Sequence, residues 1–284
     1  MSSQNLVIVL SMTLLSVVST RVDADTSRWD GHDHARARLV SGGMIERSNG
    51  ARLFRAGLEL NIRPGWKMYW RYPGDAGVPP RFDFKDSKNV KNVEVRWPAP
   101  ERVLDEGGAN LIVYKGQLLM PLHVTPEDPT KPPTIVLKLD YGICQKVCIL
   151  SEANLGLTLT RQTSGPIEKF TAAEARVPRP AALGENGLVS LRGVRREPGT
   201  AMQHLAVDLT APADTNVDLI VEGPTTDWAL PLPKLIANKA GNRRFVFGLD
   251  GAPPGLDPVG TTLRYTVILS SGQAIEVLAP IPTE

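Results

Sequence analysis

Hydrophobic and polar residues alternate strictly over one stretch in the first part of the chain. From Phe54 to Ile62, apolar side chains take every second position, and polar or small residues fill the positions between them. A period of two over this length is typical of a strand with one buried face. The stretch is followed by Pro64 and Gly65, which favour a turn. The pattern therefore predicts a strand that ends in a tight turn.

The same alternation recurs along most of the remaining chain, between segments rich in proline and glycine. The composition agrees, because 24 prolines and 25 glycines are many for a helical protein but suit short strands joined by turns. The further candidate strands are 118–124, 135–141, 155–159, 205–209, 217–221, 245–249, 263–269 and 275–278. Short strands with frequent turn signals indicate β-sandwiches. We predict an all-β protein with two tandem immunoglobulin-like β-sandwich domains.

One segment near the middle of the chain interrupts the strand pattern. Several prolines surround a short helix-like stretch, 171–176. We expect residues 166–186 to be a linker between a first domain over 25–165 and a second domain over 187–284. A length of 284 residues agrees with two domains.

The N-terminus has the pattern of a secretory signal. The apolar run Leu6 to Val18 is shorter than the roughly 20 residues that span a bilayer. Val22 and Ala24 place small residues at the −3 and −1 positions of a cleavage site after Ala24. We expect residues 1–24 to be a signal peptide, with an uncleaved anchor as the alternative. No later stretch is long and apolar enough for a span, so we expect no membrane insertion after cleavage.

Residues 25–50 are polar and glycine-rich, and we expect them to begin as a loose arm. His32 and His34 in this arm could bind copper or zinc, although two histidines are weak evidence for a site. We expect Met68 and Met120 to fill the core. The 32 basic and 30 acidic residues are scattered, which excludes the clustered basic footprint of a nucleic-acid-binding protein.

The chain has two cysteines, Cys144 and Cys148, between two predicted strands. Thiols in an exported protein tend to pair. A structural disulfide closing so short a loop would contribute only about 2 kcal/mol, against about 4.7 kcal/mol for a 100-residue loop. Short, strained bridges instead exchange readily. Two thiolates would also supply half of a zinc site. The residues alone leave redox exchange, a structural disulfide and metal binding open.

A resemblance covers residues 53–159, which are similar to the N-terminal periplasmic domain of the DsbD and ScsB family of disulfide reductases. The similarity is greatest to the ScsB-type branch, which is often linked to copper stress. The motifs that carry it are Pro64-Gly-Trp-Lys-Met-Tyr-Trp-Arg-Tyr-Pro-Gly-Asp-Ala-Gly-Val-Pro-Pro80, Val95-Arg-Trp-Pro-Ala-Pro-Glu-Arg102, Tyr114-Lys-Gly116, Met120-Pro-Leu122 and the cysteine segment with Glu152-Ala153.

The resemblance implies an immunoglobulin-like domain that shuttles electrons in the periplasm without a cofactor or metal. A membrane-embedded partner reduces its disulfide, and the domain then reduces thioredoxin-fold periplasmic proteins. By position, Cys148 is similar to the attacking cysteine of the family and Cys144 to the resolving one. Because the sequence ends at Glu284 without a membrane domain or a thioredoxin-like domain, we expect a separate membrane electron carrier.

The sequence departs from the family pattern around the cysteines. Leu150 and Ser151 stand where the best-known DsbD domains have prolines, and their cysteines are further apart. In those domains a cap loop with an aromatic residue shields the cysteines, whereas the matching stretch here, 104–111, has none. Asp105 and Glu106 in this stretch could tune the thiols or simply be solvated.

Two further features leave alternatives open. Trp66, Tyr69 and Trp70 could line a docking surface for a partner, although aromatic residues more often fill the core. The predicted second domain carries no recognisable chemical signature, and a fold alone does not define a role. The alternative to a thiol–disulfide exchange protein is therefore a periplasmic binding module, copper-related or not, whose disulfide is purely structural.

Overall fold

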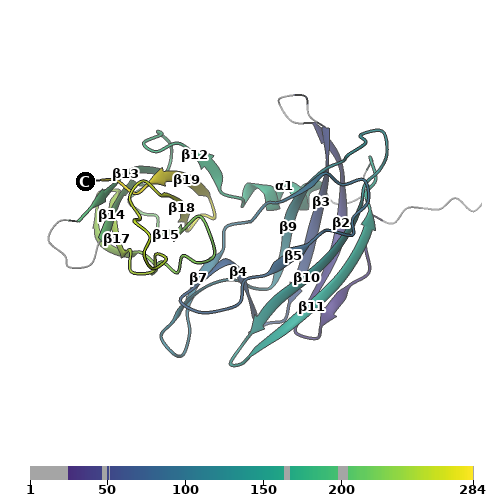
Figure 1. Cartoon of the computed structure of the whole chain (residues 1–284), viewed down its shortest axis with the longest axis horizontal. Coiled ribbons are helices and arrows are strands. Elements are labelled where there is room, and N and C mark those ends of the chain that lie inside the picture. The colour runs from purple at the N-terminus through teal and green to yellow at the C-terminus, as the bar shows by residue number, and fades with distance from the viewer. Residues whose placement is uncertain (1–24, 47–49, 51, 163–166, 198–203, 284) are drawn as a thin grey trace, which may run out of the picture.

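A computed structural model describes residues 25–46, 50, 52–162, 167–197 and 204–283. The expected signal peptide, 1–24, lies outside the described residues. The described chain contains four β-sheets, and these pair into two sandwiches that follow one another in sequence (Figure 1). The predicted all-β class with two tandem sandwiches is therefore confirmed.

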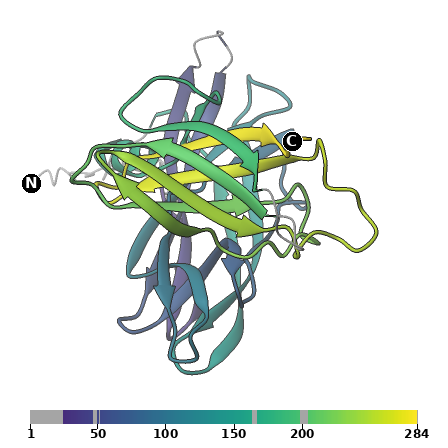
Figure 2. The ribbon, with the colours of Figure 1, turned by 90° about the vertical axis from the view of Figure 1, so that its left-hand side faces the viewer.

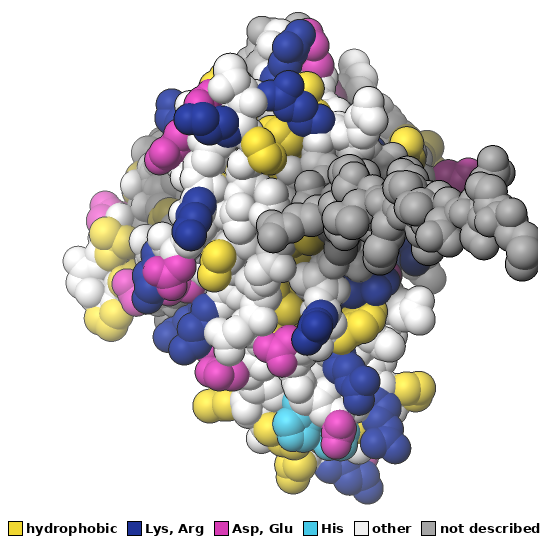
Figure 3. All heavy atoms as spheres, turned by 90° about the vertical axis from the view of Figure 1, so that its right-hand side faces the viewer, with side chains coloured by type: hydrophobic (Ala, Val, Ile, Leu, Met, Phe, Trp, Pro, Cys, Tyr) yellow, Lys and Arg dark blue, Asp and Glu magenta, His cyan; other side chains and the backbone are white. Residues whose placement is uncertain are grey.

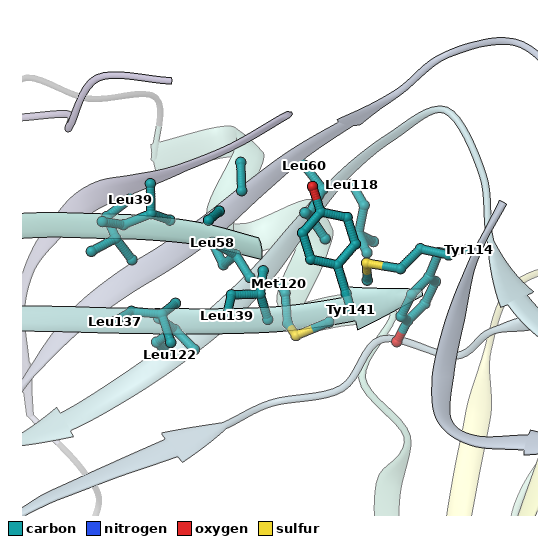
Figure 4. Close-up of a cluster of buried hydrophobic side chains, with 14 of the residues drawn as sticks. Leu39, Leu58, Leu60, Tyr114, Leu118, Met120, Leu122, Leu137, Leu139 and Tyr141 are labelled. Atoms are coloured by element: carbon teal, nitrogen blue, oxygen red, sulfur yellow. The ribbon is translucent and has the colours of Figure 1, made fainter. Parts of the chain in front are cut away.

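The first sandwich consists of two sheets that enclose one hydrophobic core. The first sheet has the strand order β1 (Asp30–His32), β2 (Ala35–Glu46), β3 (Arg52–Ile62), β9 (Gln117–Thr125) and β6 (Asn92–Val95). The second has the order β11 (Cys148–Thr158), β10 (Thr134–Cys144), β4 (Lys67–Gly74), β8 (Asn110–Tyr114) and β7 (Glu101–Leu104), and β5 (Arg81–Asp83) pairs with β10. Alternate side chains from both sheets meet between them, as Figure 4 shows for Leu58 and Met120 facing Leu139 and Tyr141. Both Met68 and Met120 are fully buried, as predicted.

The expectation of a loose arm over residues 25–50 is wrong for the part that the structure describes. β2 pairs antiparallel with β3 from Ala35↔Ile62 to Glu46↔Arg52, with an irregularity between Ser41 and Met44. The glycine pair Gly42-Gly43 lies in this irregularity. These glycines and the polar residues hid the strand because they weaken the two-residue period, while long-range pairing with β3 stabilises it.

The second sandwich is built from shorter strands. Its inner sheet, which faces the first sandwich, has the order β12 (Arg179–Ala181), β19 (Ala274–Pro280), β18 (Thr262–Leu269) and β15 (Val217–Glu222). Its outer sheet has the order β13 (Ser190–Arg196), β14 (His204–Thr210), β17 (Asn242–Gly248) and β16 (Lys234–Lys239). Figure 2 views this sandwich from the side that points away from the first one. A separate buried cluster, including Leu205, Phe247, Tyr265 and Val277, fills the space between its sheets.

The expected linker, 166–186, contains ordered structure. The helix α1 (Ile167–Ala175) packs on β9 of the first sandwich. Its Phe170 is 1% exposed and lies over two glycines, because a Cβ at Gly42 or Gly57 would come within 2.9 or 3.1 Å of the Phe170 ring. The segment then continues into β12, which pairs with β19. Among the described residues, no helix is long and apolar enough to cross a membrane.

The two sandwiches contact each other through arginines of the first and carboxylates of the second. Arg71 of β4 binds Glu222 and Glu276, with Nη2 2.7 Å from a carboxylate oxygen of each. Arg102 of β7 lies 2.7 Å from Asp218. The side chains in the Arg71 group are only 12–20% exposed.

Apolar contacts accompany these ion pairs. Ile220 and Leu232 belong to the second sandwich but pack in the buried cluster of the first. The hydroxyl of Tyr72 also donates a hydrogen bond to the carbonyl of Leu230. The second sandwich is therefore docked on strands of the sheet that carries the cysteines.

Candidate functional site

The two cysteines close the end of the β10–β11 hairpin in the first sandwich. β10 and β11 pair residue by residue from Thr134↔Thr158 to Cys144↔Cys148, the last pair of the ladder. Residues 145–147 form the turn, in which the Gln145 amide donates to the Val147 carbonyl. The sulfurs form a disulfide, and the Cα atoms lie 4.2 Å apart. The predicted strand–turn–strand position of the pair is confirmed.

The two sulfurs lie in different environments. Cys144 is 2% exposed and packs in a small cluster with Tyr69, Leu111 and Val113. Cys148 is exposed at the start of β11. Because β10 continues into the sandwich and pairs with β4 as well as β11, its last residue is covered from both sides. An external thiol or disulfide can therefore approach Cys148 but not Cys144.

Tyr69 of β4 connects the buried cluster with the exposed sulfur. Its hydroxyl oxygen lies 3.5 Å from Cys148 Sγ. Burial raises the pKa of the Tyr69 hydroxyl, and the negative charge of Asp105 raises it further. The phenol is therefore protonated at neutral pH and can donate a hydrogen bond to the sulfur.

The position of the Tyr69 ring depends on a glycine. A Cβ at Gly77 would lie 2.3 Å from Tyr69 Cε1, and Gly77 has a φ of +132°, which side-chain-bearing residues rarely adopt. The loop that follows β4 can therefore close against the ring only with glycine at this position. The glycine at position 77 of the motif is thus explained by its close contact with the Tyr69 ring.

The β7–β8 loop, which matches the family's cap loop, carries Asp105, whose charge acts on Tyr69. The Asp105 carboxylate accepts hydrogen bonds from the amides of Gly107 and Ala109 and so holds the loop in a turn. Its charge also acts on Tyr69, which places Asp105 near the cysteine site. The described hydrogen bonds of the Asp105 carboxylate are with amides of its own loop, and an effect of Asp105 on the thiols stays a prediction.

Two exposed apolar side chains flank Cys148 in the hairpin, and others lie near the residues that pack with Cys144 or on β10; the sequence patterns did not reveal them. Val147 and Leu150, within the hairpin, are 65% and 76% exposed. Val78 packs against Gly142 of β10 and is also exposed, and Leu104 follows Val103, which packs on the cluster around Cys144. Exposed apolar side chains that gather in this way are typical of interaction surfaces.

The three aromatic residues that follow the Pro64-Gly65 turn, Trp66, Tyr69 and Trp70, differ in burial. Trp70 is fully buried in the main core and Tyr69 is 3% exposed, so both are core residues. Trp66 is half-buried and stacks on the ring of His34, with centroids 3.9 Å apart. The docking surface considered for these aromatics is therefore not formed by Tyr69 and Trp70.

His32 and His34, the candidate copper or zinc ligands, lie close together. Their ring centroids are 5.0 Å apart. Within the described ranges, no cluster of three or more His, Cys, Asp or Glu side chains could hold a metal ion.

Comparisons with known proteins agree with this geometry. Residues 49–160 match the family described as thiol:disulfide interchange protein DsbD, N-terminal. The crystal structure of the N-terminal periplasmic domain of ScsB from Proteus mirabilis superposes with a TM-score of 0.70 at 23% identity, over 92% of this chain and 99% of that one. No curated protein sequence matches the chain. The described sandwiches thus have the fold of the ScsB domain, and residues 49–160 belong to the DsbD N-terminal domain family of thiol–disulfide interchange proteins.

Proposed function

We propose that this chain is a periplasmic thiol–disulfide exchange protein that passes electrons from a membrane reductant to thioredoxin-fold substrates through Cys144 and Cys148. The unequal exposure of the two sulfurs carries the proposal. Exchange needs one sulfur that a partner can reach and a second that can resolve the mixed disulfide. Cys148 meets the first requirement and the adjacent Cys144 the second.

In the reduced protein, the Cys148 thiolate attacks one sulfur of the substrate disulfide. A mixed disulfide forms, and the other substrate sulfur leaves as a thiolate that takes up a proton. Cys144 then loses its proton and attacks Cys148 Sγ, which releases the second substrate thiol and leaves the Cys144–Cys148 disulfide. Two electrons have passed to the substrate, and a dithiol of the membrane reductant restores the pair by the same steps in reverse.

Two side-chain groups support these steps. The Tyr69 hydroxyl can donate a hydrogen bond to a thiolate at Cys148. The exposed apolar side chains of the hairpin, Val147 and Leu150, give a partner a surface that contributes affinity without another covalent bond. We assign the periplasm as the location because residues 1–24 have a signal-peptide pattern and the similar ScsB domain is periplasmic.

Trapping experiments test the roles of the two cysteines. Oxidised thioredoxin-fold protein is incubated with each reduced single variant, and mixed disulfides are counted on non-reducing gels. Cys144→Ser should accumulate the mixed disulfide because nothing resolves it, whereas its matched control Cys148→Ser should form none. Trapping by Cys148→Ser alone would reverse the assigned roles.

A redox titration separates exchange from a structural disulfide. A reduction potential well above about −300 mV, within reach of thioredoxin-like partners, is expected for a carrier. A potential below about −300 mV, together with no trapped partner, would instead support the periplasmic binding module with an inert disulfide.

A further inference from the structure

The two sheets of the second sandwich carry opposite charge. The inner sheet presents Glu222, Glu276 and Asp218, which bind arginines of the first sandwich. The outer sheet presents basic side chains from three strands: Arg192 and Arg195 of β13, Arg244 of β17, and Lys234 and Lys239 of β16. This outer sheet lies on the side turned away from the first sandwich (Figures 1 and 2). The sandwich thus already uses charge complementarity on one sheet and has a basic surface on the other.

The acidic residues near the outer sheet do not balance its basic ones. Asp208 of β14 binds both Arg195 and Arg244, and Glu197 lies within electrostatic reach of Arg244. Burial alone would raise the pKa of Asp208, but the hydrogen bond from Arg244 and the two positive charges lower it overall. Asp208 is therefore ionised and already shared between two arginines.

The basic side chains border a hollow in the outer sheet. A depression of about 740 Å³ is lined by residues from all four strands, among them Arg192, Asp208, Lys239, Asn242 and Arg244. Asp208 is the single acidic residue among the described residues that line it. By contrast, the opposite end of the molecule in Figure 3 shows basic and acidic side chains across the same face. The hollow combines excess positive charge with amide and hydroxyl groups.

A buried cation beside the hollow strengthens its positive potential. Arg243 is only 3% exposed and also lines the hollow. Its Nη2 donates to the carbonyls of Pro212, Ala213 and Thr215, each at 3.2 Å. Its Nη1 is buried and finds no acceptor among the described residues. A buried guanidinium without a carboxylate partner is unfavourable, and an anion bound nearby would reduce that cost.

We propose that the outer face of the β13–β14–β17–β16 sheet binds an acidic segment of a partner polypeptide, whose Asp or Glu side chains enter the hollow and pair with Arg192, Lys239 and Arg244. Arginine and lysine at the rim of a depression suit carboxylates that protrude from a chain. A lipid surface is flat and would contact the rim without filling the hollow, so a polypeptide fits better. This surface is separate from the cysteine site, and the inference does not rest on the proposed exchange reaction.

Strand addition at the edge of this sheet is a less suitable mode. β16 is an edge strand with all six residues exposed, including Leu235 and Ile236. However, lysines stand at both of its ends, and a bulge lies between Leu235 and Ala237. Both features hinder the pairing of a further strand. The face of the sheet, and not its edge, is therefore the proposed contact.

Fluorescence anisotropy with a labelled Glu-rich peptide tests the proposal on the full chain. The peptide should bind at low ionic strength, and its glutamine counterpart should not. The double variant Arg192→Glu/Lys239→Glu should weaken binding by at least about tenfold, because each change removes an attraction and adds a repulsion. The matched control, Lys85→Glu/Lys131→Glu, changes the net charge equally at two exposed lysines of the first sandwich and should bind like the parent.

The neutral variant Arg192→Gln/Lys239→Gln provides a second measurement if charge reversal disturbs folding, and it should weaken binding by about fivefold. Equal binding by this variant and the parent, or equal loss in the control variant, would overturn the proposal. Binding to vesicles of phosphatidylglycerol without binding to the peptide would also overturn it, in favour of a lipid surface. The assay reads binding without any thiol reagent, so its outcome is independent of the exchange experiments.

Discussion

The first and second sandwiches are both pairs of sheets around an aliphatic core, yet they differ in what their ends and faces carry. The first extends one hairpin into a turn that holds Cys144 and Cys148 in unequal environments. The second has no cysteine. Its distinctive groups are the carboxylates that its inner sheet presents to the first sandwich and the basic side chains of its outer sheet. A shared architecture therefore says little about role, because the chemistry depends on which side chains it presents.

The contact between the sandwiches adds a second lesson. Arg71 lies two residues from Tyr69 on β4, and Arg102 two residues from Leu104 on β7. The second sandwich holds both arginines. It therefore restrains β4, which carries Tyr69, and β7, which precedes the loop of Asp105. We infer a supporting role for it in stability, and a binding role for its outer sheet.

Removal of the second sandwich should produce the largest change. A fragment of residues 25–177, which keeps α1, should still exchange disulfides with a generic thioredoxin-like donor, because the cysteines and Tyr69 all lie in it. It should lose at least about 3 kcal/mol of stability, since the arginines lose their partners and buried apolar surface becomes exposed. Exchange kinetics and urea unfolding measure both effects. A folded fragment without exchange activity would show that the second sandwich helps to build the site.

Arg71→Ala should have the next largest effect, a loss of about 3 kcal/mol in the free energy of unfolding. The change leaves Glu222 largely buried without a cation and leaves Glu276 with Arg264 alone. Urea unfolding of the full chain measures the loss. Lys85→Ala is the matched control, because the Lys85–Asp83 pair is exposed and its removal should change nothing measurable. Equal stability of the two variants would mean that the ion pairs do not hold the sandwiches together.

Tyr69→Phe should have the smallest effect of the three. It removes the hydroxyl 3.5 Å from Cys148 Sγ but keeps the ring that packs on Gly77. Loss of about 1 kcal/mol of hydrogen bonding to the thiolate corresponds to about fivefold slower attack on a partner disulfide. Stopped-flow exchange kinetics measure the rate, and thermal unfolding should change little. An unchanged rate would limit Tyr69 to packing.

Local alternation was enough to predict the strands with a strong two-residue period and the place of the cysteine pair. The stretch 54–62 became β3, and 135–141 lies within β10, because a two-residue period is a local property that each strand carries in its own residues. The position of Cys144 and Cys148 at a strand–turn–strand corner followed in the same way. The motifs between 64 and 153 likewise indicated the domain family that residues 49–160 match.

Which sulfur is exposed, which residues lie near it and how the sandwiches meet all depend on contacts between residues far apart in sequence. Tyr69 and Cys148 are 79 residues apart in sequence, and Arg71 and Glu222 are 151 apart. The strand at Ala35–Glu46 also escaped prediction, because its glycines fit only when β3 and Phe170 pack against them. Such contacts depend on how whole sheets stack, and the pattern of any one segment does not contain that information.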